Sequence, residues 1–169
     1  GIVHRDLKPE NVLIAATPAG GDTVKVLDFG LAKLRTASDQ TESFTSPGVV
    51  MGTAGYMAPE QLTGAGVDHR ADVFAIGVMA VEVIVGRRPF RGQSYHELLA
   101  SIARDPVFLG GEAPELRRLE TILRRATARD PATRHPSIAA LASDLIPALR
   151  GLAAAVPDSD ANTALESPS

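Results

Sequence analysis

The sequence has no cysteine, no tryptophan and few other aromatic residues, with five Phe and two Tyr among 169 residues. The absence of cysteine excludes disulfides and thiolate metal sites. There is no basic excess, with 17 Lys and Arg against 20 Asp and Glu, so nothing in the charge favours nucleic acid as a partner. The longest apolar run, residues 73–85, contains Glu82 and is shorter than the ~20 residues that cross a bilayer. We therefore expect no membrane segment in this chain.

The residues that are present have the composition of a soluble globular domain, with 44% hydrophobic and 22% charged residues. The length suffices for one compact domain with a buried core. The lack of cysteine and of a signal-peptide pattern favours a cytoplasmic location, while a membrane anchor elsewhere in a longer protein stays open.

The first third of the chain combines short apolar runs with polar loops. Val12–Ile14 and Val24–Leu27 flank a segment rich in Gly and Pro, and this pattern predicts a β-hairpin. Residues 30–55 are polar and irregular, which predicts one long loop of the length that usually has a function or is disordered.

From Glu60 onward the apolar residues recur at helical spacing. Helices are predicted over residues 70–85, 94–104, 114–128 and 137–149. Asp68 is the predicted N-cap of the first helix, which is apolar on most faces and should be central and buried. Gly151 is placed to end the last helix. Residues 151–169, rich in Ala, Pro, Ser and Asp, are predicted to form a disordered tail.

Residues 4–11 read HRDLKPEN, which matches the kinase catalytic-loop pattern H-R-D-L-x-x-x-N. Phosphoryl transfer needs a carboxylate that orients the attacking hydroxyl and accepts its proton, and Asp6 suits that role. It also needs a metal-ligating oxygen on the same loop, which Asn11 can supply. Lys8 would place a positive charge near the transferring phosphoryl group.

Two further motifs follow in the same order as in kinases. Asp28-Phe29-Gly30 follows an apolar run, and in the kinase pattern this Asp binds the Mg²⁺ that bridges the ATP phosphates. Carboxylate oxygen is a ligand that Mg²⁺ prefers. Residues 52–60 read GTAGYMAPE, which resembles the end of a kinase activation segment. Three ordered motifs within sixty residues make coincidence untenable.

Over residues 1–150 the chain thus resembles the C-terminal lobe of a Hanks-type (eukaryotic-like) serine/threonine protein kinase, in the style of the bacterial members. The resemblance implies a mainly α lobe with a short β-hairpin carrying the catalytic and metal residues, within the α+β fold of the family. It implies a catalytic loop at 4–11, an activation segment at 28–60, and transfer of the ATP γ-phosphoryl group, with Mg²⁺, to Ser and Thr hydroxyls of proteins. Further implied properties are autophosphorylation or kinase dimerisation.

The resemblance also implies supporting and regulatory residues. Glu60 should pair with Arg134 and anchor the activation segment, and Asp72 should hold the catalytic-loop backbone. Arg5, which precedes Asp6, marks kinases that are switched by a phosphate on the activation loop. The candidate regulatory positions on that loop are Thr45, Ser46 and Thr53.

The sequence has no G-x-G-x-x-G loop and no V-A-I-K-like stretch, the parts with which the N-terminal lobe grips ATP. We therefore expect the N-lobe to be absent and these 169 residues alone to be inactive. One alternative is a catalytically inactive, truncated kinase-like binding or regulatory module, although intact Asp6, Asn11 and Asp28 argue against it. Another is a small-molecule phosphotransferase, against which the long activation segment and Ala58-Pro59-Glu60 argue.

Overall fold

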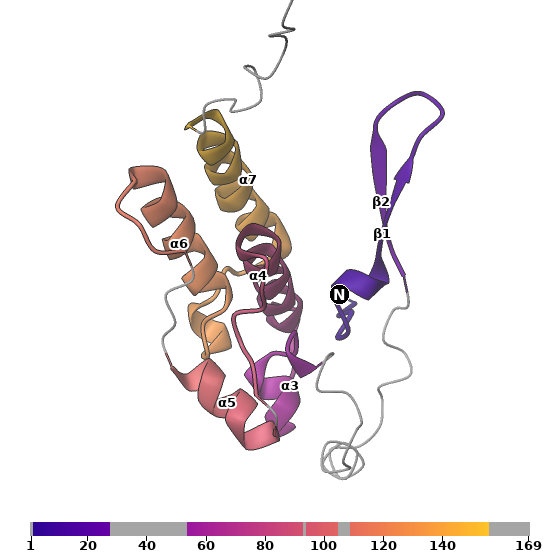
Figure 1. Cartoon of the computed structure of the whole chain (residues 1–169). Coiled ribbons are helices and arrows are strands. Elements are labelled where there is room, and N and C mark those ends of the chain that lie inside the picture. Colours follow the sequence, from indigo (N-terminus) through magenta and orange to yellow (C-terminus); the bar gives the residue numbers. More distant parts are fainter. Residues whose placement is uncertain (1, 28–53, 93, 105–108, 156–169) are drawn as a thin grey trace, which may run out of the picture.

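The computed structural model describes residues 2–27, 54–92, 94–104 and 109–155. Within these residues the fold is mostly helical, with one two-stranded antiparallel sheet. In chain order the elements are η1 (Pro9–Asn11), β1 (Val12–Ala16), β2 (Asp22–Val26), α3 (Pro59–Thr63), α4 (Arg70–Val85), α5 (Tyr95–Ala103), α6 (Pro114–Ala126), η3 (Pro131–Thr133) and α7 (Ile138–Ala155). Helices α4, α6 and α7 lie side by side, α3 and α5 lie at one end of them, and the hairpin projects away from the helices (Figure 1).

The predicted β-hairpin is present, and its strands extend further into the predicted loop, over Val12–Ala16 and Asp22–Val26. Strands β1 and β2 pair from Val12 opposite Val26 to Ala16 opposite Asp22, so the turn is shorter than the predicted loop. Gly20 and Gly21 both have positive φ, at 83° and 89°, a backbone conformation that favours glycine over residues with a Cβ. The two adjacent glycines therefore allow a short turn between β1 and β2.

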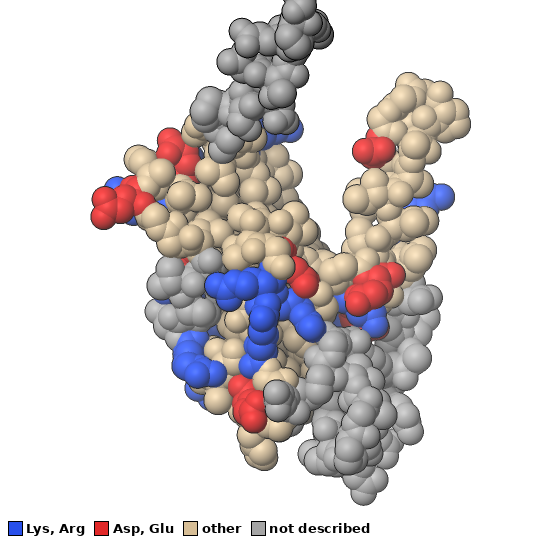
Figure 2. Space-filling model, viewed as in Figure 1, with Lys and Arg blue, Asp and Glu red and all other residues tan. Residues whose placement is uncertain are grey.

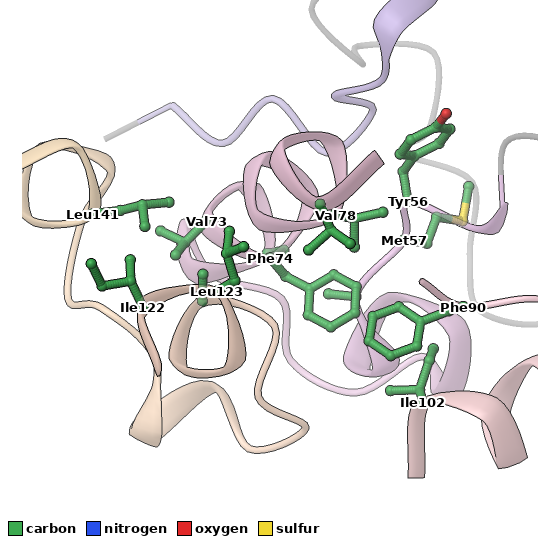
Figure 3. Packing of buried hydrophobic residues seen from close by; sticks show 14 of the residues in the cluster. Tyr56, Met57, Val73, Phe74, Val78, Phe90, Ile102, Ile122, Leu123 and Leu141 are labelled. Carbon is green, nitrogen blue, oxygen red and sulfur yellow. The ribbon is translucent and has the colours of Figure 1, made fainter. Parts of the chain in front are cut away.

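Helix α4 is the centre of the hydrophobic core. One nearly continuous set of its side chains is buried, including Val73, Phe74, Val78 and Val81. The Phe74 ring stacks on that of Phe90 at a centroid distance of 5.6 Å (Figure 3). Helix α4 is therefore central to the core, as the pattern predicted, although Val83 near its end is exposed.

Helix α6 approaches α4 closely, and Gly77 permits this approach. A Cβ at Gly77 would lie 2.9 Å from Ala126 Cβ and 2.9 Å from Thr127 Cγ2. Leu119, Leu123 and other apolar residues of α6 belong to the same buried cluster as residues of α4 and α7. The helices therefore share one core, and Figure 3 shows part of it.

The predicted helices are present, but the predicted N-cap of α4 was wrong and α6 ends slightly early. The N-cap position of α4 belongs to His69, while the Asp68 carboxylate accepts a hydrogen bond from the Arg70 N–H at 2.8 Å. Helix α6 ends at Ala126, two residues early, and its C-cap Thr127 is buried against Gly77. The end of α6 coincides with a contact to a residue 50 positions earlier, which a single sequence does not reveal.

Helix α7 does not end before Gly151 as predicted; it continues to Ala155. Glycine within a helix costs only about 1 kcal/mol relative to alanine, and Leu152 packs against the core one residue later. The first five residues of the predicted disordered tail are therefore helical, and residues 156–169 lie outside the described part of the chain.

By length and composition, α7 could also cross a membrane, because its 18 residues have a mean hydropathy of 1.4. The same helix packs on α6 and α4 through Leu141, Leu145 and Ala148, which are buried. Ile138 and Ile146 of the same helix are about half exposed, so α7 is buried along one side only.

Candidate active site

The catalytic-loop segment forms a compact turn that brings three predicted site residues together. The 3₁₀ turn η1 reverses the chain, with the Asn11 N–H donating to the Lys8 carbonyl at 3.0 Å. The Asn11 side-chain amide then donates to the Asp6 carbonyl at 2.8 Å and lies 3.4 Å from Asp6 Oδ2. Lys8 Nζ lies 3.6 Å from the same Asp6 oxygen. A carboxylate, an ammonium and an amide therefore converge over six residues of chain.

His4 joins this turn to the end of the hairpin, a role that the sequence analysis did not assign. It is buried, its Nδ1 accepts from the Asp6 N–H at 3.3 Å, and its Nε2 lies 3.1 Å from the Leu27 carbonyl. In a neutral imidazole only one ring nitrogen carries a hydrogen. Because Nδ1 accepts, the hydrogen is on Nε2, which donates to the Leu27 carbonyl. Leu27 also donates its N–H to the Asn11 carbonyl at 2.8 Å. The residue before Asp28 is thus fixed to the catalytic loop at both backbone groups.

Asp72 in α4 holds the start of the loop. Its carboxylate accepts from the His4 N–H at 2.8 Å and from the Arg5 N–H at 2.9 Å, and the side chain is buried. Arg5 has φ of +66°, the one non-glycine residue with positive φ in the described part of the chain. Such a conformation costs on the order of 1–3 kcal/mol and persists only where surrounding contacts enforce it. The two charge-assisted hydrogen bonds to Asp72 are contacts of that kind.

Glu60 and Arg134, 74 residues apart, form a buried bidentate ion pair. Nη1 and Nη2 of Arg134 lie 2.7 and 2.8 Å from the two Glu60 oxygens. Arg134 also donates to three backbone carbonyls, those of Arg70, Ala128 and Arg129, so all five of its N–H groups have partners. Its guanidinium stands 4.9 Å from the centre of the Phe74 ring. The pair therefore joins α3 to the loop after α6, over the aromatic core.

Tyr56 anchors the other side of the segment before α3. Its hydroxyl donates to Glu82 Oε2 at 2.5 Å, and the Arg88 guanidinium stands 5.7 Å from its ring centre. Burial, with the hydrogen bond to Glu82 and the charge of that carboxylate, raises the pKa of Tyr56 well above its usual range. The hydroxyl thus stays protonated and serves as a hydrogen-bond donor.

The structure therefore brings together Arg5, Asp6, Lys8 and Asn11, and it places Asp72 beneath them and the Glu60–Arg134 pair at the base of α3. Asp28, Thr45, Ser46 and Thr53 lie outside the described residues. Sequence motifs did not single out His4 as a link, nor Gln61, whose side chain contacts the Arg5 carbonyl. The histidine of the HRDLKPEN motif was the available signal for His4, whereas no motif signalled the Gln61 contact.

Comparison with known proteins identifies a family. The family described as "Protein kinase domain" matches residues 1–146. The chain is 43% identical over 151 residues to the serine/threonine-protein kinase Pkn1 of Myxococcus xanthus, covering 88% of this chain and 21% of that protein. It is 40% identical over 150 residues to PknL of Mycobacterium tuberculosis, covering 86% and 35%, and 38% identical over 148 residues to PknB of the same organism, covering 86% and 23%.

The chain belongs to the protein kinase domain family. It spans between about a fifth and a third of the length of these curated relatives, all of which are named as serine/threonine-protein kinases. The family generally uses ATP and Mg²⁺.

Proposed function

We propose that this chain is part of a serine/threonine protein kinase that transfers the γ-phosphoryl group of ATP to Ser and Thr hydroxyls of proteins. The observation that carries the proposal is the convergence of Asp6, Lys8 and Asn11 on one turn, with the Asp6 carboxylate 3.6 Å from Lys8 Nζ and the Asn11 amide bonded to the Asp6 carbonyl. Catalysis of phosphoryl transfer depends mainly on positioning and charge stabilisation. A turn fixed by backbone and buried side-chain contacts suits both.

Asp6, Lys8 and Asn11 have different roles in the proposed reaction. Asp6 orients the substrate hydroxyl and accepts its proton as the new P–O bond forms and the P–O bond to the departing ADP breaks. Lys8 stabilises the negative charge that develops on the transferring group. The Asn11 amide nitrogen is engaged with Asp6, which directs Oδ1 away from that carbonyl and makes it the atom of Asn11 available to a hard cation.

Asn11 and Asp28 would hold a metal ion, which would supply positive charge to neutralise that of the phosphates. The donor set fits such an ion, since an amide oxygen and a carboxylate are both hard oxygen ligands. The contacts of His4 and Asn11 with Leu27 support this assignment, because they tie the residue before Asp28 to the loop that carries Asn11.

Regulation through the activation segment is part of the proposal. A phosphate on Thr45 or Ser46, added by autophosphorylation, would bring negative charge that the Arg5 guanidinium can bind. Thr53 would contribute to the choice of Ser and Thr over Tyr acceptors. The backbone of Arg5 is held by Asp72, so its side chain starts from a fixed point on the loop.

The experiment compares Mg²⁺–ATP kinase activity of residues 1–169 with that of the chain extended upstream to include the nucleotide-gripping elements, on a generic Ser/Thr protein. Each form is paired with its Asp6→Asn variant, which keeps the shape and removes the base. We expect activity in the extended chain alone, and its loss in the variant. A folded extended chain without activity would instead favour a binding or regulatory module, and turnover by residues 1–169 would contradict the need for the second lobe.

A further inference from the structure

Gln61, in the first turn of α3, connects two segments that lie 56 residues apart in sequence. Its Oε1 accepts from the Ala58 N–H at 3.0 Å, and its Nε2 donates to the Arg5 carbonyl at 2.8 Å. The side chain therefore spans from the end of the activation segment to the residue before Asp6. Glu60, its neighbour in sequence, pairs with Arg134, so two adjacent side chains connect α3 to two different parts of the chain.

Arg5 is the residue whose backbone most needs such contacts. Its φ of +66° is unfavourable for a side chain other than glycine, and its N–H is already bound to Asp72 at 2.9 Å. The bond from Gln61 occupies the remaining backbone polar group of Arg5. Two helices, α4 and α3, thus each supply one side chain that holds the same strained residue.

We propose that Gln61 is a positioning residue for the catalytic base: it holds the Arg5 carbonyl and so fixes the peptide that leads into Asp6. The inference rests on the proposed function, in which Asp6 orients the attacking hydroxyl. An amide is required here because the site needs an acceptor for the Ala58 N–H and a donor for the Arg5 carbonyl at the same side-chain length. Glutamate keeps the acceptor and lacks the donor, and methionine has neither strong group.

The test uses the extended, active kinase with Gln61→Met and Gln61→Glu. Thr63→Val is the matched control, because the Thr63 hydroxyl bonds only within α3, to the Pro59 and Glu60 carbonyls, among the contacts described. We expect kcat to fall about tenfold in Gln61→Met, since a mispositioned base affects the chemical step. The KM for ATP should stay within about twofold, and the control should match the wild type in both constants.

Two readouts separate positioning from a general structural role. The kcat deficit of Gln61→Glu should be at least as large as that of Gln61→Met, because the carboxylate has no donor for the Arg5 carbonyl and places a negative charge against that oxygen. In hydrogen exchange, peptides over residues 2–8 should exchange faster in Gln61→Met, while peptides from α6 and α7 should match the wild type.

Each outcome decides the matter. If Gln61→Met keeps kcat within twofold while Asp6→Asn abolishes activity, the inference is wrong and the proposed function stands. If Gln61→Met and Gln61→Glu accelerate exchange throughout α6 and α7, the residue is structural and the positioning role is wrong. If the folded wild-type kinase is itself inactive, the proposed function fails and this inference fails with it. A selective loss of kcat with local exchange near Asp6 supports the inference.

Discussion

The helical core differs from the N-terminal segment, residues 2–27, which contains the catalytic loop and the β1–β2 hairpin. Different forces hold the two regions in place. In the core, α4, α6 and α7 bury large apolar side chains, among them Phe74, Leu119 and Leu123, with almost no exposure. In the hairpin, apolar side chains such as Ile14 and Val24 are more than half exposed, and the strands project away from the helices (Figure 1). Packing therefore stabilises the core, while the catalytic loop depends on a few directed hydrogen bonds.

The loop is attached to the helices through side chains that bind its backbone. The Asp72 carboxylate accepts hydrogen bonds from two backbone N–H groups, and the Gln61 amide donates one to a backbone carbonyl. Each of these bonds fixes the position of one peptide group. Directed bonds of this kind define geometry well and contribute modestly to the free energy of unfolding. Mutations in the two regions should consequently separate stability from activity.

The charged residues also differ in where they lie. Figure 2 shows Lys and Arg side chains gathered on one face over the end of α4 and the segment leading to α5, with acidic groups beside them. These are exposed charges, whereas Glu60, Asp72 and Arg134 are buried and fully engaged with partners. Substitution of the buried charges should therefore have far larger effects than substitution of the exposed ones.

Breaking the buried ion pair should give the largest effect. Arg134→Ala would leave the Glu60 carboxylate buried without a partner and remove donors from three carbonyls, so we expect a loss of about 3–5 kcal/mol in the free energy of unfolding. Urea unfolding monitored by circular dichroism measures this. The control is Arg118→Ala on the exposed face of α6, which should change stability by less than about 0.5 kcal/mol. Equal effects in the two variants would contradict the importance of the pair.

A cavity in the core should come next. Leu123→Ala removes a fully buried side chain of α6, and we expect a loss of about 2–5 kcal/mol in the free energy of unfolding. At a temperature where the variant is still folded, kcat of the extended kinase should stay close to the wild-type value, because Leu123 lies on α6, which packs on α4 and α7. Val83→Ala, at a side chain that is 83% exposed, provides the matched control with little change expected. A strong fall in kcat in the folded Leu123→Ala protein would show that the two regions are coupled.

Asp72→Asn should affect activity more than stability, the reverse of Leu123→Ala. The variant keeps one oxygen acceptor and turns an NH₂ group toward a backbone N–H, so one of the two bonds to His4 and Arg5 is lost. We expect kcat of the extended kinase to fall about ten- to hundredfold, with a loss of stability of about 1–3 kcal/mol. Steady-state kinetics and urea unfolding of the same preparation measure both. A larger loss of stability than in Leu123→Ala, with kcat unchanged, would contradict the division of roles.

Sequence reasoning predicted the helical core well because its signals are local. The apolar pattern of 70–85 is sufficient to define α4 with the correct bounds, and Ser94 with Glu97 marks the start of α5 through a hydrogen bond that the structure contains at 3.2 Å. The helix ends were less predictable, since Gly151 lies within α7 where later packing of Leu152 extends the helix. Local signals cannot report a contact made further along the chain.

The sequence motifs predicted the residues of the candidate site, but not the hydrogen bonds that link its segments. Asp6, Lys8 and Asn11 follow from the pattern, and the Glu60–Arg134 pair expected from the family resemblance is present in the structure. The links from His4 to Leu27 and from Gln61 to Arg5 end on backbone carbonyls, which are the same for every residue type. A sequence pattern carries no information about such partners.

The smallest predicted effect is a pH dependence that originates in the core and not in the catalytic loop. His135 is almost fully buried, and its Nε2 lies 3.3 Å from Asp144 Oδ2. Burial and the nearby charge of Arg125 lower the pKa of His135 below its ordinary value of 6.5, and Asp144 offsets this only in part. The unfolded chain therefore binds a proton at this residue before the folded chain does. Stability from neutral His135 is fully present above pH 6.5 and is lost as the pH falls below it.

The matched comparison is His135→Gln, which cannot titrate. We expect the difference in the free energy of unfolding between wild type and variant to be constant from pH 7 to 8. Between pH 6.5 and 5 the wild type should lose stability relative to the variant. The change can reach at most about 1.4 kcal/mol per pH unit for a single proton. Urea unfolding across this range measures it, and His69→Gln, at an exposed histidine, controls for the general acid sensitivity of the chain. A difference that moves in favour of the wild type on acidification would show that Asp144 outweighs burial, and that the buried face of α7 is held by an ion pair instead of by packing.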